Sequence, residues 1–192
     1  AVRERAMFRG LSRPDYTKLI ESWITNGASG AKITKLEPSD GVAEGRFALD
    51  VEFTAGSYAQ LMQDRLLVFK AAIVSRLDEL SLAGAARKQP VVLKSHAYTE
   101  TVRVKLPEGF NVDELPDPLK LDTPFGNYTS TYEVKDGQLL FTRAMTLRAT
   151  TIPADQYGSV RTFFERIRAA EIQAVTVEVI GGAVLVQFLV VG

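Results

Sequence analysis

The chain has 192 residues, of which 46% are apolar and 24% charged, and its 23 basic residues balance 23 acidic ones. This composition describes one folded domain with a real core, and it argues against a disordered tail or a basic surface for nucleic acid. The sequence has no Cys and a single His, which excludes a disulfide, a Cys nucleophile and the usual zinc sites. Only His96 could serve a His-dependent catalytic triad.

The start of the chain and its most apolar stretch bear on targeting. The sequence opens at Ala1 with no signal-peptide pattern, which suggests a fragment of a longer protein or a processed product. Residues 180–192 are strongly apolar, but they are too few to cross a bilayer as a helix, which takes roughly 20 residues. We therefore expect no membrane insertion, and the absence of Cys fits either an exported or a cytosolic compartment.

Two amphipathic helices are predicted, one near each end of the chain. The first, at about residues 12–26, has Ser12 as its cap, and Gly27 suits its end in a left-handed conformation. The second, at about 153–170, starts at Pro153. Apolar residues recur on one face of each helix: Tyr16, Leu19, Ile20, Trp23 and Ile24 in the first, Tyr157, Val160, Phe164 and Ile167 in the second. Residues 1–30 are thus expected to be a helical lead-in to a main domain at 31–192.

Between the helices, apolar residues recur at every second position, which is the period of a half-buried strand. Strand patterns cover residues 47–53, 102–106 and 139–147, and residues 128–134 alternate less strictly. Weaker candidates cover 31–36, 66–74 and 91–98. Asp136-Gly137 predicts a tight turn that joins 128–134 and 139–147 into a hairpin. The Pro-rich segment 106–124 is expected to be an ordered loop or an edge crossing, because its prolines remove backbone donors.

Two apolar segments after the second helix, 174–180 and 183–191, predict a last hairpin around Gly181-Gly182. Residues 183–191 are apolar on both faces and carry neither charge nor Pro, so an open edge there would invite aggregation. We expect this arm to be a central strand, or to pair with another chain or with a part of the polypeptide N-terminal to Ala1. Homo-oligomerisation through it is left open.

The predicted fold class is mainly β, a β-rich α+β arrangement: an antiparallel β-sandwich-like domain with two amphipathic helices. Successive strands are joined by turns and not by crossover helices, which excludes a parallel sheet. Seven residues from these elements are expected to be mostly buried: Trp23, Phe47, Val51, Val102, Val104, Tyr157 and Phe164.

Catalytic groups are sparse, and each arrangement that the sequence offers has a physical objection. Ser95, His96 and Glu100 suggest a triad, but neighbours in a strand point to opposite faces, and no Gly-x-Ser-x-Gly elbow presents the serine. Glu100 and Glu133 could face each other like the carboxylates of a glycosidase, a coincidence expected by chance among 23 acidic residues. We therefore expect no enzyme.

Binding sites for ions and ligands are equally weak in the sequence. Asp113, Glu114 and Asp117 could hold calcium, but their spacing matches no EF-hand loop. Residues 26–30 follow a helix instead of opening one, so they make no phosphate cradle. We expect no metal and no cofactor. Aromatic and polar residues of the strands and loops form a possible binding surface: Tyr98, Asp117, Phe125, Asn127, Tyr128 and Tyr132.

A series of short motifs in a fixed order carries a family resemblance. The motifs are Arg87-Lys88-Gln89-Pro90, Leu106-Pro107-Glu108-Gly109-Phe110, Leu115-Pro116, Phe125-Gly126-Asn127-Tyr128, Asp136-Gly137, Arg143, Ile152-Pro153-Ala154-Asp155-Gln156-Tyr157, Arg161 and Phe163-Phe164. The run resembles the uncharacterised C-terminal domain found after the transglutaminase-like core in a group of large exported bacterial proteins. The resemblance covers about residues 31–180 and is strongest over 106–164.

That resemblance implies a β-sandwich-like domain of unknown biochemical role, periplasmic or extracellular, beside a Cys-His-Asp transglutaminase-like domain that would lie N-terminal to Ala1. Arg143 is the one charged residue that the pattern singles out, and it is expected to be a partly buried, ion-paired arginine. The favoured function is a non-catalytic accessory domain that positions or shields an adjacent transglutaminase-like or protease-like domain. The alternative is an independent extracellular module that binds glycan or peptide. No nucleic-acid partner is expected.

Overall fold

The chain folds mainly into antiparallel β-sheets with three helices, which confirms the predicted fold class. The computed structural model describes residues 2–56, 58–63, 65–76, 82, 84, 86–106, 109–179 and 189–191. Both predicted helices are present as α2 (Arg13–Gly27) and α3 (Tyr157–Glu171), and a short 3-10 turn, Ala154–Gln156, leads into α3. A further helix, α1 (Val2–Gly10), precedes α2 and had no signal in the sequence pattern.

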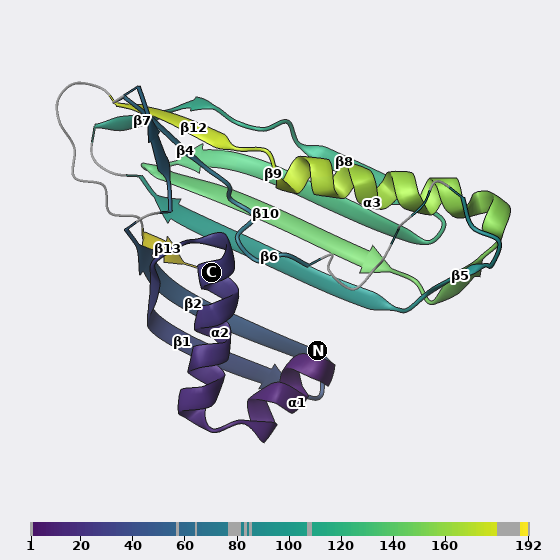
Figure 1. The fold of residues 1–192 in the computed structure, drawn as a ribbon. Helices are drawn as coiled ribbons and strands as arrows, with labels where there is room; N and C mark the ends of the chain where they lie inside the picture. Colours follow the sequence, from purple (N-terminus) through teal and green to yellow (C-terminus); the bar gives the residue numbers. More distant parts are fainter. Residues whose placement is uncertain are drawn as a thin grey trace.

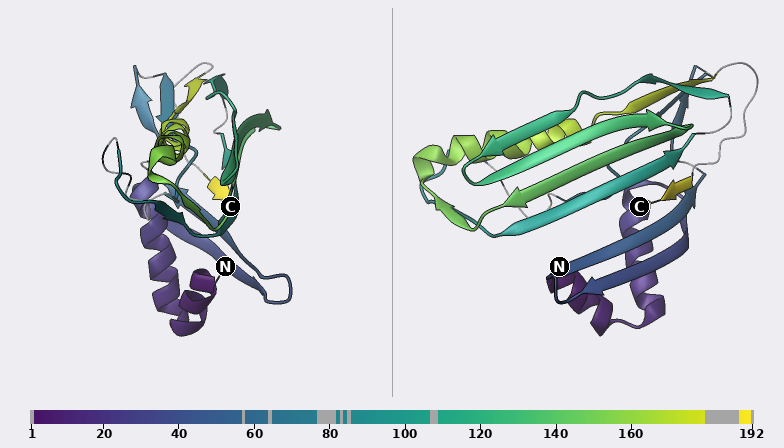
Figure 2. Two further views of the ribbon diagram at one scale, coloured as in Figure 1. Left: turned by 90° about the vertical axis from the view of Figure 1, so that its right-hand side faces the viewer. Right: turned by 180° about the vertical axis from the view of Figure 1, so that it is seen from behind.

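Seven strands form the largest sheet, and all its neighbouring strands are antiparallel. In spatial order they are β1 (Ala31–Gly41), β2 (Arg46–Ala55), β13 (Leu189–Val191), β6 (His96–Lys105), β10 (Gln138–Leu147), β9 (Gly126–Lys135) and β8 (Leu119–Thr123). Helix α2 lies along β1 and β2, and α3 lies over the other half of the sheet on the same side (Figure 1). The opposite side carries no helix (Figure 2).

Two smaller sheets complete the described fold. One has the order β3 (Gln60–Met62), β4 (Leu66–Phe69), β12 (Val175–Val179) and β7 (Phe110–Glu114), and the other pairs β5 (Val91–Leu93) with β11 (Thr150–Ile152). The predicted strand 66–74 is therefore shorter than expected, since β4 ends at Phe69. The predicted strand 91–98 is split between β5 and β6, which belong to different sheets.

Local sequence accounts for the ends of α2. Ser12 caps the helix, because its Oγ accepts a hydrogen bond from the Asp15 amide. The prediction that Gly27 ends the helix in a left-handed conformation is wrong. Gly27 is the last helical residue of α2, and it allows another part of the backbone to pass close to the helix. A Cβ on Gly27 would lie 1.9 Å from the carbonyl oxygen of Ile73, so only glycine lets this backbone pass so near the helix.

The hairpin of β9 and β10 is confirmed. Asp136 and Gly137 both have positive φ, 51° and 70°, which is the backbone of the type I′ turn that matches the twist of antiparallel strands. Gln138 then pairs with Lys135, and the register runs without interruption to Leu147 and Gly126. The turn chemistry therefore fixes which side chains of both strands face inward.

The Pro-rich segment contains more regular structure than predicted, although it does cross between sheet edges. Strand β7 is the last strand of the four-stranded sheet, and β8 is the last strand of the seven-stranded sheet. Pro116, Pro118 and Pro124 lie outside both strands, where their missing backbone donors cost nothing. The prolines thus separate two short edge strands and do not exclude strand pairing.

The predicted C-terminal hairpin is wrong in the described residues. Strand β12 pairs with β4 and β7, whereas β13 pairs with β2 and β6 in a different sheet. Residues 189–191 therefore form the central strand that we gave as one alternative, and both of their edges are occupied within the chain. Pairing of this strand with a second copy has no free edge to use there. Residues 183–188 lie outside the described residues.

The buried apolar side chains form two clusters under the seven-stranded sheet. One joins α2, β1, β2 and the four-stranded sheet to the inner faces of β6 and β10, and it includes Val51, Val102 and Val104. The other packs α3 against the far half of β9 and β10, and it includes Tyr157 and Phe164. These five residues are buried as predicted, whereas Trp23 and Phe47 are only half-buried.

Candidate functional site

A polar row crosses the inner face of the large sheet between the two apolar clusters. Arg143 on β10 is the Cα partner of Glu100 on β6 and of Ser130 on β9. On β10 itself, Phe141 belongs to the first cluster and Met145 to the second. The alternation of strands therefore places one charged row, the Arg143 layer, where the two cores meet.

Three segments of the chain converge on the guanidinium of Arg143, which has no exposed surface: β6, the connection after β4 and the end of α3. Its Nη2 donates to Glu100 Oε1 at 2.9 Å and also donates to the carbonyl oxygen of Val74. Its Nη1 lies 2.6 Å from Oε1 of Glu171, the last residue of α3, in an ion pair. Arg76 then places its Nε 3.2 Å from the second oxygen of Glu100.

These contacts pair the buried positive charge of Arg143 with negatively charged carboxylates. Burial opposes the charge on Arg143, but the carboxylates of Glu100 and Glu171 outweigh it, so the pKa of Arg143 is raised. Glu171 stands at the C-terminal end of α3, where the helix dipole disfavours an acid, and Arg143 compensates that position. Two arginines and two glutamates thus form a neutral network that ties α3 and residues 74–76 to the sheet.

Tyrosines flank the layer and remain protonated. Burial, followed by the nearby charge of Glu171, raises the pKa of Tyr128, whose hydroxyl donates to Glu171 Oε1 at 3.3 Å. Burial likewise raises the pKa of Tyr98, and the Arg143 guanidinium lies 5.7 Å from the centre of its ring. The Tyr98 hydroxyl, Arg143 Nε and Arg143 Nη1 have no hydrogen-bond partner among the described residues, so Nη1 meets Glu171 in an ion pair alone.

The residues of the hypothetical triad and carboxylate pair are not brought together. Ser95 and His96 are exposed, and the His96 ring lies 5.9 Å from that of Tyr98. Glu100 faces inward and is bound by Arg143 and Arg76. Glu133 is exposed on the other face of β9, because it follows the inward-facing Tyr132 by one position.

The hypothetical calcium ligands are spread along the chain between two sheets. Asp113 and Glu114 belong to β7, Asp117 follows it, and all three are exposed. Within the described part of the chain, no group of three or more His, Asp or Glu side chains could hold a metal ion.

The six residues of the predicted binding surface do not share one exposed face. Phe125 and Tyr128 are buried in the second cluster, and the Phe125 ring packs on Phe163 with centroids 5.4 Å apart. The side chains of Tyr98, Asn127 and Tyr132 are half-buried, and Asp117 is exposed. The sequence singled out Arg143 but missed Glu171 and Arg76, and it offered Glu100 only as a candidate catalytic residue, whereas the structure sets Glu100 opposite Arg143.

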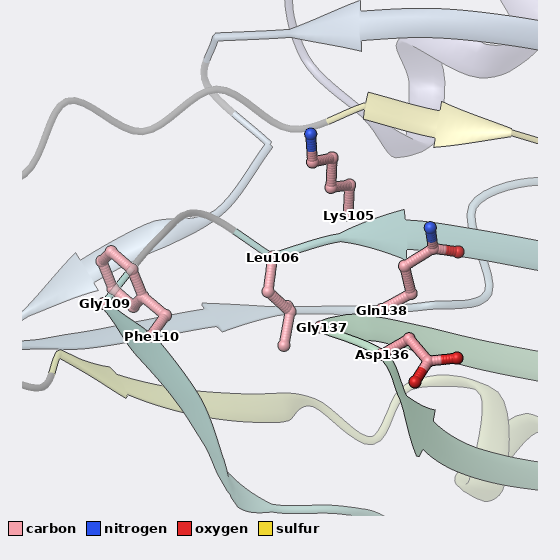
Figure 3. Close-up of a pocket in the computed structure, with 7 residues that line it drawn as sticks. All are labelled: Lys105, Leu106, Gly109, Phe110, Asp136, Gly137 and Gln138. Atoms are coloured by element: carbon pink, nitrogen blue, oxygen red, sulfur yellow. The ribbon is translucent and has the colours of Figure 1, made fainter.

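Two surface hollows adjoin one another along β7. The first, of about 310 Å³, lies at the β9–β10 turn and is lined by Lys105, Leu106, Gly109, Phe110, Asp136, Gly137 and Gln138 (Figure 3). The second, of about 510 Å³, is lined by Asn111, Val112, Asp113, Leu115 and Val134. Neither contains a residue of the Arg143 layer, so the buried network and the hollows are separate features.

The described residues form a β-rich domain with a buried, ion-paired layer around Arg143. The chain belongs to a family described as a domain of unknown function with solved structure, DUF3858, whose model matches residues 64–177. This match takes in the Arg143 layer and both hollows.

A solved structure and a search of curated proteins complete the comparisons. The fold is similar to part of the crystal structure of a "putative protease" from Parabacteroides distasonis ATCC 8503, with a TM-score of 0.53 and 16% identity. The similarity covers 61% of this chain and 24% of that chain, and at this identity it concerns the fold alone. No curated protein matches the chain.

None of the described helices is long and apolar enough to cross a membrane.

Proposed function

We propose that this chain is a non-catalytic accessory domain of a larger bacterial polypeptide, where it packs against a transglutaminase-like or protease-like domain and positions or shields it. The observation that carries the proposal is the unequal coverage of the structural match, 61% of this chain against 24% of the Parabacteroides distasonis protein. A domain of this kind acts as a rigid neighbour. By the resemblance in its sequence, we further propose that it works in the periplasm or outside the cell.

The Arg143 layer supports a scaffold role for the domain. The charged side chains of the layer pair with one another: Glu100 forms ion pairs with two arginines, and Glu171 contacts Arg143 and Tyr128. A general acid or base needs a proton that it can exchange with a substrate. Carboxylates committed to buried arginines instead fix the position of α3 and of residues 74–76 on the sheet.

The test uses the complete natural polypeptide that contains this sequence. It is compared with a version that lacks residues 31–192 and with this chain alone, each assayed for amide hydrolysis and acyl transfer on labelled casein. We expect this chain alone to give no turnover above buffer, and its removal to lower the Tm or raise the KM of the remainder. The variant His96→Ala in the complete polypeptide serves as the control and should leave kcat unchanged. Turnover by this chain alone that falls in His96→Ala would contradict the proposal.

A further inference from the structure

The second hollow lies where two strands have open edges. Strand β8 pairs with β9 only from Leu119 opposite Ser130 to Thr123 opposite Gly126. Among the described strands, residues 131–135 of β9 therefore have a partner on the β10 side alone. Strand β7 is likewise an edge, paired only with β12. Figure 2 shows β7 beyond the end of β8 along the same margin of the large sheet.

The hollow between these edges combines apolar side chains with unpaired main chain. Val112 and Leu115 are half-buried, and Val134 is 47% exposed. Backbone N–H and C=O groups of an edge strand are ready to pair with an added strand. An extended peptide gains affinity from such main-chain bonds and specificity from alternate side chains.

Acidic residues accompany the hollow along both strands: Asp113 lines it, Glu114 follows Asp113, Glu133 precedes Val134 on the outer face of β9, and Asp136 lines the first hollow. Asp113, Glu114, Glu133 and Asp136 are all exposed, and none forms an ion pair with another described residue. Two lysines, Lys105 and Lys135, lie near them and leave the margin with a surplus of negative charge. Unpaired carboxylates around an apolar centre complement a ligand that alternates cationic and small apolar side chains.

We propose that the β7–β9 groove, lined by Asn111, Val112, Asp113, Leu115 and Val134, binds a partner polypeptide segment in extended conformation with Lys or Arg alternating with Val or Ile. The segment adds to the free edge of β9 or β7, places its apolar side chains on Val112, Leu115 and Val134, and sets its cations against the acidic margin. This inference does not depend on the proposed accessory role.

The test measures binding of a defined peptide to the intact chain. The probe is acetyl-Gly-Lys-Val-Lys-Val-Lys-Gly-amide, titrated to about 1 mM while backbone amides are followed by NMR, a concentration suited to weak peptide binding. We expect saturable shifts confined to residues 109–115 and 131–137. A peptide with Glu in place of Lys, and one with N-methylated backbone amides along one edge, should bind at least about tenfold more weakly.

Exposed acidic residues on an edge strand can also serve to prevent aggregation through that edge. Variants of the groove test whether they bind the peptide instead. Glu133→Lys and Asp113→Lys should each weaken binding of the Lys peptide about fivefold or more, and added salt should do the same. Glu44→Lys, in the turn between β1 and β2, is the matched control and should bind like the parent chain. Circular dichroism confirms that each variant is folded.

Three results would overturn the proposal. They are an absence of localised shifts at the highest peptide concentration, equal binding of the Lys and Glu peptides, and a dimer in light scattering whose contact shifts the same amides without peptide. The last result would make the groove an interface between copies of this chain.

Discussion

Arg143 on β10 and Glu100 on β6 face each other directly across two antiparallel strands, with Nη2 2.9 Å from Oε1. The pair lies at the boundary between the two apolar clusters, and Glu171 joins it from the end of α3. A buried ion pair of this kind is costly to break, because the remaining charge loses its partner and cannot reach water. The two halves of the core therefore depend on one side chain.

Arg143→Met should destabilise the chain by about 3–5 kcal/mol, because it leaves Glu171 and one oxygen of Glu100 buried beside an apolar group. The triple variant Arg143→Met, Glu100→Gln, Glu171→Gln should recover a large part of that loss, since it removes the uncompensated charges. Urea unfolding gives both values. Arg161→Met is the control, because Arg161 pairs with Glu165 on the surface of α3 and should cost less than about 1 kcal/mol. Equal stability of Arg143→Met and the parent chain would contradict a structural role for the layer.

Two helical glycines, Gly27 in α2 and Gly158 in α3, predict opposite responses to the same substitution. Gly27→Ala should destabilise by about 1–3 kcal/mol or more, because its Cβ would lie 1.9 Å from the Ile73 carbonyl oxygen. Gly158→Ala should stabilise by up to about 1 kcal/mol, because alanine favours the helix and its Cβ would meet nothing within 4 Å. Thermal unfolding of the two variants beside the parent chain checks the pair. If both alanine variants are more stable than the parent chain, the Ile73 carbonyl does not lie as close to Gly27 as described.

Local signals in the sequence predicted those parts of the fold that form from neighbouring residues. Asp136-Gly137 fixed the β9–β10 hairpin through its backbone conformation, and Ser12 marked the start of α2. The position of β13 could not be predicted in this way, because Val190 pairs with Phe53 and Val104, which are remote in the chain. A hairpin across Gly181-Gly182 was the nearest local choice, and long-range pairing overrode it.

In the candidate site, too, local sequence signals indicated some residues, while the contacts between remote segments could not be predicted. Arg143 stood out as a charge in an apolar strand, but its pairing with Glu100 depends on the register of β10 against β6, two strands that are remote in the chain. Glu171 and Arg76 reach the site from a helix end and from the connection after β4, and no periodicity in their own segments indicates that convergence. Asp113, Glu114 and Asp117 suggested calcium by their type, whereas the structure places the first two in β7 and the third in the connection to β8.

Alkaline pH should unfold the chain through its buried tyrosines. Burial raises the pKa of Tyr132 from its ordinary value of 10.0 to about 12, and raises those of Tyr58, Tyr98 and Tyr128 further. Because the folded state holds these protons more tightly than the unfolded state, the stability they confer is complete below pH 10 and falls as the pH rises through 12.

The measurement combines tyrosinate absorbance with circular dichroism along a pH titration. We expect most tyrosines to ionise together with loss of structure, and not before it. Tyr132→Phe keeps the ring that packs on Phe141, at 4.8 Å between centroids, and removes one of the titrating groups. Its stability should therefore decline less steeply between pH 10 and pH 12 than that of the parent chain. Free ionisation of the tyrosines near pH 10 in the folded chain would contradict the burial described for them.

The last prediction concerns β13, which joins the β1–β2 unit to the rest of the large sheet. Leu189 pairs with Thr54 and Lys105, Val190 with Phe53 and Val104, and Val191 with Glu52 and Arg103. Removing residues 189–192 would leave β2 and β6 with facing open edges, since no other described strand lies between them. Removal of Gly192 alone keeps β13 and is the matched control.

The shortened chain should lose about 2–4 kcal/mol in urea unfolding, because several ladder hydrogen bonds worth about 0.5–1.5 kcal/mol each disappear. Its two exposed edges should also favour association, visible as a larger mass in light scattering, since unpaired strand edges template contacts with other chains. Removal of the longer segment 183–192 should have at least the same effect. If the chain that ends at residue 188 keeps both the unfolding midpoint and the mass of the control, β13 does not hold the two parts of the sheet together.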